Sequence, residues 1–175
     1  MSRIPAFQRI TLRRRQQGQT LVVMALILPV LLAFILTVVE IGGRVLQRSD
    51  VEDALQQATR AAVQLFDYRA FADNRQSVRS EAEIIAAAKL AFIQNLQHVG
   101  GLAEGETPAS VAEKVVWTVL PQGGTCHFGT PDTRDDVAFP TPALCAVLDA
   151  PMAGMPLKGA WTPKIRAAAT IDQIR

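Results

Sequence analysis

The chain has 175 residues and a formal net charge of +2. An apolar fraction of 49% and a charged fraction of 19% exclude a disordered or collagen-like chain, because such chains bury too little apolar surface to fold. Two cysteines and two histidines are too few for a disulfide-dense mini-protein or a four-cysteine zinc module.

The charge is distributed unevenly along the chain. Residues 1–18 contain no acid and five arginines: Arg3, Arg9, Arg13, Arg14 and Arg15. The remaining residues carry 13 basic and 16 acidic side chains. Because no basic stripe with interleaved aromatic residues follows the leader, we do not expect the chain to bind nucleic acid.

A long apolar segment follows the basic leader. No charged residue occurs from Gln19 to Val39, and Leu21–Val39 would form a helix of about 28 Å, close to the thickness of a bilayer's hydrocarbon core. The adjacent Arg13, Arg14 and Arg15 predict a cytoplasmic N-terminus, with the rest of the chain outside. A cleaved secretory signal peptide is the alternative, but no Ala-x-Ala site follows the apolar run.

The residues around Gly18 carry a more specific pattern. Arg13-Arg14-Arg15-Gln16-Gln17-Gly18 precedes Gln19 and the apolar run, which contains Ala25-Leu26-Ile27-Leu28-Pro29 and is followed by Glu40-Ile41-Gly42. A basic leader that ends in Gly before such a run resembles a prepilin-type signal. The pattern is most similar to TadE-like and TadG-like minor pseudopilins of the tight-adherence (Flp) pilus system, over residues 13–65.

This resemblance implies a structural role in pilus assembly and a set of partners. A prepilin peptidase would cut between Gly18 and Gln19, and the apolar helix would remain as an anchor. The major pilin and other minor pseudopilins would be further partners, in homo- or hetero-oligomers. The helix motif that carries the resemblance comprises Ala25, Leu26, Leu28, Pro29, Glu40 and Gly42.

One position departs from the family pattern. The family usually has Glu five residues after the cleavage-site Gly, where it is thought to neutralise the new N-terminal amine of a neighbouring subunit, and this chain has Val23. The alternative is therefore an uncleaved single-pass envelope protein whose outer head is a binding module.

The helix is predicted to continue from Leu21 to about Phe66, because Arg44–Phe66 contains no Gly or Pro. An apolar stripe at spacings of four and three residues either packs on the chain's own head or meets partner helices; it comprises Val51, Leu55, Ala58, Ala62 and Leu65. Glu40 and Arg44 are four residues apart and are expected to pair locally, with contact between Glu40 and a partner as the alternative.

The remaining chain predicts a mixed head. Asp67–Arg79 is a polar connection, and Ser80 with Glu83 forms a capping box for a helix over Glu81–Val99 that ends at Gly100-Gly101. Strands are expected at Val115–Leu120, Val137–Phe139, Leu144–Leu148 and Ile165–Ile174, the last with Ile165, Ala167, Ala169 and Ile171 on one face. The predicted fold is α+β: a membrane helix, a stem, a second helix and a small antiparallel sheet.

Eighteen residues lie between the two cysteines in the outward part, where Cys126 and Cys145 are expected to form a disulfide. A metal site with His127 is the alternative, but it lacks a fourth ligand. Asp132, Asp135 and Asp136 predict a solvated loop, with a calcium loop as the alternative, and His98 predicts a contact with a helix C-terminus. No nucleophile–base pair or cofactor motif stands out, so we expect neither enzymatic activity nor a cofactor.

These expectations divide the chain into four parts. Residues 1–18 form a basic cytoplasmic leader, 19–40 the transmembrane helix, 41–66 the stem and 67–175 an extracytoplasmic α+β head. The predicted location is the bacterial inner membrane, crossed once, with the head in the periplasm or outside the cell.

Overall fold

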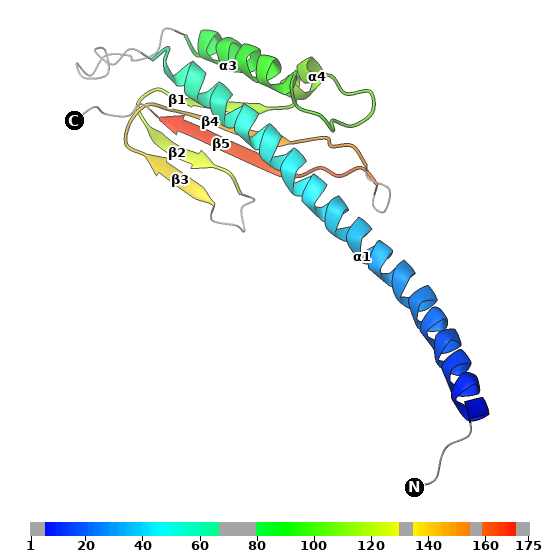
Figure 1. Ribbon diagram of the computed structural model, residues 1–175. Helices are drawn as coiled ribbons and strands as arrows, with labels where there is room; N and C mark the ends of the chain where they lie inside the picture. Colours follow the sequence, from blue (N-terminus) through cyan, green and yellow to red (C-terminus); the bar gives the residue numbers. More distant parts are fainter. Residues whose placement is uncertain (1–5, 67–79, 130–134, 155–158, 171–175) are drawn as a thin grey trace. The chain divides into compact units, whose positions relative to one another are not determined.

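The computed structural model describes residues 6–66, 80–129, 135–154 and 159–170, with the backbone alone for residues 6–19. The elements run in the order α1 (Ala6–Val63), α3 (Glu81–Leu96), α4 (Pro108–Glu113), β1 (Val116–Leu120), β2 (Gly124–His127), β3 (Asp136–Phe139), β4 (Ala143–Asp149) and β5 (Lys164–Thr170) (Figure 1). The chain divides into two compact units, Met1–Gly43 and Arg44–Arg175. The predicted α+β class, with a long apolar helix and a β-containing head, is confirmed.

Helix α1 is longer than the sequence analysis predicted. It begins at Ala6, so residues of the basic leader are helical as well, and it ends at Val63. The segment from Ala6 to Leu28 has no proline and is rich in Arg, Gln and Leu, which have high helix propensity. Pro29 lies inside the helix, where it removes one backbone donor but does not end the helix.

Two helix N-termini are capped by side chains. The backbone N–H of Glu83 donates to the Ser80 Oγ at 3.1 Å, as predicted, and starts α3. Helix α3 ends at Leu96, earlier than the predicted Val99, so Gly100-Gly101 lies beyond its last turn. The sequence analysis missed α4, although Thr107 and Ser110 form a reciprocal capping box and Pro108 occupies the first helical turn.

A carboxylate next to α4 is held by its neighbours. The Lys114 ammonium and the Ser110 hydroxyl both donate to the carboxylate of Glu106. These hydrogen bonds, with that from Lys114 the larger effect, lower the pKa of Glu106.

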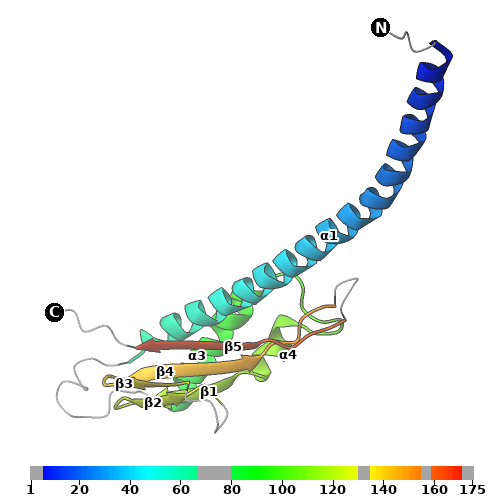
Figure 2. The same cartoon turned by 90° about the horizontal axis from the view of Figure 1, so that it is seen from below.

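The strands form two antiparallel sheets, where a single small sheet was predicted. β1, β4 and β5 form a three-stranded sheet in the order β1-β4-β5, with Trp117 opposite Ala146 and Ala146 opposite Ala167. β2 and β3 form a separate two-stranded sheet, and β2 was not predicted as a strand. Figure 2 shows the strands in front of α3, so the helices cover one face of the three-stranded sheet.

The terminal strand has the predicted alternation. Ile165, Ala167 and Ala169 of β5 are buried on the helix-covered face, while the residues between them are only half-buried. β5 is described as far as Thr170, so Ile171 lies outside the described residues, as does the predicted connection at residues 67–79. The predicted strands at residues 115–120, 137–139 and 144–148 are confirmed, with boundaries shifted by one residue.

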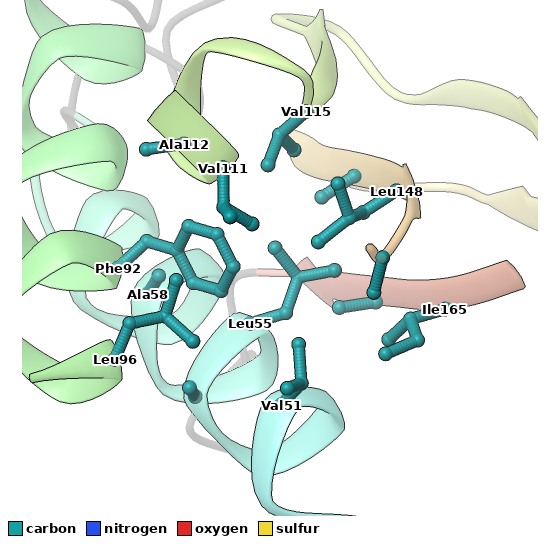
Figure 3. Packing of buried hydrophobic residues seen from close by; sticks show 14 of the residues in the cluster. Val51, Leu55, Ala58, Phe92, Leu96, Val111, Ala112, Val115, Leu148 and Ile165 are labelled. Carbon is teal, nitrogen blue, oxygen red and sulfur yellow. The ribbon is translucent and has the colours of Figure 1, made fainter. Parts of the chain in front are cut away.

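The main core lies between the second half of α1, the helices α3 and α4, and the sheet. Figure 3 shows Leu55 of α1 among Phe92 of α3, Val111 of α4 and Leu148 of β4. The edge of the Phe92 ring meets the ring of Trp117, with 6.5 Å between centroids.

This core decides between the two interpretations of the apolar stripe. Val51, Leu55, Ala58 and Ala62 are all completely buried within the unit that contains the head, and Leu65 is 41% exposed. A partner helix cannot reach the first four side chains, so the interpretation of the stripe as a partner surface is wrong for them. The stripe packs on the chain's own head.

The packing of the core predicts that Leu55 of α1 and Leu65, which follows the end of α1, differ in their contribution to stability. Leu55→Ala should lower the free energy of unfolding of the head by about 2–5 kcal/mol, because it leaves a cavity among fully buried neighbours. Leu65→Ala, the matched control, should cost less than about 1 kcal/mol. Urea denaturation of the full-length protein in detergent micelles, followed by tryptophan fluorescence, measures both. Equal losses would contradict the packing.

Candidate functional site: an apolar anchor and its motif

Among the described residues, one helix is long and apolar enough to cross a membrane. It is the part of α1 from Thr20 onward, whose most apolar 18-residue window has a mean hydropathy of 3.1 and no buried residue. The large apolar side chains from Leu21 to Val39 are between 46% and 72% exposed. The chain itself leaves this surface uncovered, and an apolar surface of this length matches the hydrocarbon core of a bilayer.

Polar backbone and side-chain groups within this segment are largely satisfied by the helix. The Thr37 Oγ1 donates to the carbonyl oxygen of Ala33 at 2.8 Å, which removes the cost of a hydroxyl in lipid. Pro29 has no N–H, so the carbonyl of Ala25 lacks its usual donor four residues later. The motif residues Leu26 and Leu28 are exposed.

The second part of the motif follows the apolar run. Glu40 is only 8% exposed, in contrast to its apolar neighbours on α1. A Cβ built on Gly42 would meet no atom within 4 Å, so none of the described residues requires glycine at that position. The predicted Glu40–Arg44 pair stays a prediction.

The residues predicted to direct processing and orientation lie in α1. Gly18 and Gln19 are both within this helix, as are Arg13, Arg14 and Arg15. The predicted peptidase cut between Gly18 and Gln19 and the predicted orientation therefore concern a helical segment, and both stay predictions.

A disulfide joins Cys126 of β2 to Cys145 of β4, with 5.9 Å between the Cα atoms. Both cysteines are buried, and the bond connects the two-stranded sheet to the face of the three-stranded sheet that the helices leave uncovered. A third buried residue, Phe128, completes this small cluster. The bonded sulfur atoms are not thiolate ligands, so the alternative of a metal site at Cys126, His127 and Cys145 is wrong.

The other candidate side chains have structural contacts. Asp135 pairs with Arg166 at 2.7 Å, and Asp136 pairs with His127 Nδ1 at 3.0 Å, while Asp132 lies outside the described residues. His98 is exposed two residues after the end of α3. In the described part of the chain, no group of three or more His, Cys, Asp or Glu side chains could hold a metal ion.

An open groove of about 340 Å³ runs between α1 and α3. It is lined by Asp50, Asp53, Ala54, Gln57, Asn95, His98 and Val99. No serine, threonine or cysteine is among these residues, so His98 has no hydroxyl or thiol nucleophile to activate there.

A contact that the sequence analysis missed joins α1 to a distant loop. The Arg44 guanidinium lies over the ring of Trp161, 5.3 Å from its centroid, and its Nη2 donates to the carbonyl oxygen of Gly159 at 3.3 Å. More than 110 residues separate the partners, so no local sequence pattern could have predicted the contact.

These features define a class of protein: an α+β head that follows a long helix with an exposed apolar segment from Leu21 to Val39. Comparison with known proteins finds a likeness for part of this helix. Residues 18–60 match the family model described as TadE-like protein, which confirms the resemblance over most of the segment that showed it. No curated protein and no solved structure matches the chain.

The disulfide predicts a measurable contribution to the stability of the head. Replacing both cysteines by alanine should lower the free energy of unfolding by about 3 kcal/mol, because the bond closes a loop of 19 residues. Denaturation of the full-length protein in micelles, compared with the unsubstituted chain, measures the loss. Alkylation and intact mass of protein isolated from its native membrane provide the control, and two free thiols there would contradict the bond.

Proposed function

We propose that this protein is a minor pseudopilin-like structural component that is anchored in the bacterial inner membrane by α1 and helps to assemble a tight-adherence pilus. The observation that carries the proposal is the TadE-like match at residues 18–60, because it covers the exposed apolar part of α1 and the helix motif. The role is exerted by helix packing and needs no cofactor.

Two independent features support an orientation with the head outside the cytoplasm. The arginines that precede the apolar segment favour a cytoplasmic N-terminus. The disulfide favours an oxidising compartment for the head, because cytosolic thiols are kept reduced. Both features give the same orientation for a single crossing, with residues 1–18 as the leader and residues 67–175 in the head.

The structure restricts where other pilus subunits could bind. The head covers the stripe of the stem, so we propose that contacts between helices involve the exposed apolar surface from Leu21 to Leu46. In lipid this surface is solvated by acyl chains, and in a filament it must be covered by helices of other subunits. The prepilin peptidase, the major pilin and other minor pseudopilins are the proposed partners.

Gly42 provides a specific candidate for such a contact. In the described part of the chain, no atom comes within 4 Å of the position of its missing Cβ, and alanine has a higher helix propensity than glycine. Small residues allow the backbones of two helices in a membrane to approach closely. We therefore propose that Gly42 is where the backbone of a neighbouring subunit's helix approaches α1.

Val23 supports a second candidate function. If the usual Glu is needed for processing or for packing into a filament, this chain is an uncleaved single-pass protein whose head binds an envelope partner. The two functions predict different mature chains, which separates them directly.

The mature N-terminus distinguishes the two functions. Mass spectrometry of the membrane-extracted protein should find a chain that begins at Gln19, cut by a prepilin peptidase. Gly18→Leu, which removes the residue before the cut, should leave the full-length chain. A native protein that begins at Met1 or Ser2 would favour the uncleaved binding module.

Pilus assembly tests the structural role. Deletion of the protein should abolish pili in the sheared cell-surface fraction, and complementation with Gly42→Ala should restore about one tenth of them, which corresponds to a loss of about 1.4 kcal/mol in helix association. Gly100→Ala is the matched control, because its added Cβ also meets nothing within 4 Å. Normal pili in the deletion strain would contradict the proposed function, and equal effects of the two alanines would contradict the contact at Gly42.

A further inference from the structure

Two loops of the head are fixed to α1 immediately after the apolar segment. The loop between β4 and β5 is attached at Arg44, which donates a hydrogen bond to the Gly159 carbonyl oxygen and lies over the ring of Trp161. The loop between α3 and α4 lies against Gln47: a Cβ added to Gly101 of this loop would be 2.3 Å from the Gln47 Nε2. Both loops thus meet the helix within one turn, at Arg44 and Gln47.

Backbone hydrogen bonds join the two loops to each other. Met152 and Trp161 exchange bonds of 3.0 and 3.4 Å, and the N–H of Ala153 donates to the Gly101 carbonyl oxygen at 2.8 Å. Arg44, Gly101, Met152, Gly159 and Trp161 therefore form one connected structure, called here the Arg44 rim. A rim held by hydrogen bonds keeps its side chains in place when it meets a surface.

The chain itself keeps the Arg44 rim near the bilayer. Arg44 is five residues after Val39, the last residue of the uncharged run, and both lie in α1, where five residues rise about 7.5 Å. The interfacial layer on each side of the hydrocarbon core is roughly 5–8 Å thick. Val45 and Leu46, which flank the rim on α1, are 62% and 66% exposed, so the apolar surface of the helix extends past Arg44.

The chemistry of the rim suits a negatively charged membrane surface. In the loop between β4 and β5 and at the start of β5, the described residues 151–154 and 159–164 include the exposed Lys164 and no acidic residue, and Arg44 adds a guanidinium. Tryptophan and arginine favour the interfacial layer, because their apolar parts enter it while their polar atoms bind headgroup oxygens.

We propose that the Arg44 rim rests on the anionic phospholipid headgroups of the bilayer that holds α1, with Trp161 at the level of the interface. The contact would fix the tilt of the head above the membrane before assembly. The inference rests on the anchoring part of the proposed function and is independent of the role in the pilus.

Tryptophan fluorescence can test this contact in the full-length protein. The protein is reconstituted into nanodiscs of phosphatidylcholine and phosphatidylglycerol that carry a nitroxide on the lipid headgroup. Trp117→Phe leaves Trp161 as the reporter, and Trp161→Phe leaves Trp117 as the control. Trp117 pairs with Ala146, six residues before Met152, so it lies about 20 Å along the strand from the rim.

The expected result is that the nitroxide quenches Trp161 roughly twofold more than Trp117, because only the rim reaches the interfacial layer. Removing phosphatidylglycerol, or raising NaCl to about 0.5 M, should reduce the difference, because salt screens attraction between charges. Equal quenching of the two tryptophans would overturn the proposal. Quenching of Trp161 that is unaffected by lipid charge and salt would also overturn it, since the contact would not involve the anionic headgroups.

Two further measurements support the quenching experiment. The first tests the rim contact without any substitution that could disturb folding, and the second measures membrane insertion separately. In the unsubstituted chain labelled with 5-fluorotryptophan, headgroup nitroxides should broaden one of the two ¹⁹F signals, and equal broadening would overturn the proposal without any substitution. Carbonate extraction reports insertion separately. An extractable protein would contradict the membrane anchor and this inference with it, whereas an inserted protein with an unquenched Trp161 would contradict only the rim contact.

Discussion

The structure depends on one helix that meets two different environments. From Leu21 to Val39, α1 exposes large apolar side chains all around its axis. From Val51 it buries a single stripe against α3 and the sheet. A helix that is apolar on every face needs lipid or other helices around it, whereas a helix with one apolar face needs a core. The head covers that stripe. The apolar part stays exposed and can be covered by a bilayer or by other subunits.

The second constraint is covalent and joins the two sheets. The two-stranded sheet contributes Cys126 and Phe128 to a buried cluster that Cys145 completes. So small a cluster offers little burial, and the disulfide provides the remaining constraint on the attachment of the second sheet. In the proposed orientation the head folds in an oxidising compartment, where the disulfide between Cys126 and Cys145 can form and persist.

Much of the helical structure could be predicted because its signals are local. Ser80 starts α3 through its own side chain, and the apolar run of α1 needs no tertiary information. Thr107, Pro108 and Ser110 carried an equally local signal for α4, which the sequence analysis passed over. The order β1-β4-β5 and the separate pairing of β2 with β3 could not be read from single strands, because strand pairing depends on residues far apart in the chain.

The sequence by itself determined the apolar segment, its basic flank, the TadE-like motif and the presence of one amphipathic stripe, because each depends on residue type and spacing alone. Only the tertiary structure decided that the stripe is covered by the chain's own head. Apolar residues at regular spacing indicate that one face of a helix is buried, but they do not indicate which residues cover that face. The same holds for Arg44 and Trp161. Their contact forms when loops distant in the sequence close on α1, and a cation and a ring give no local sign of each other.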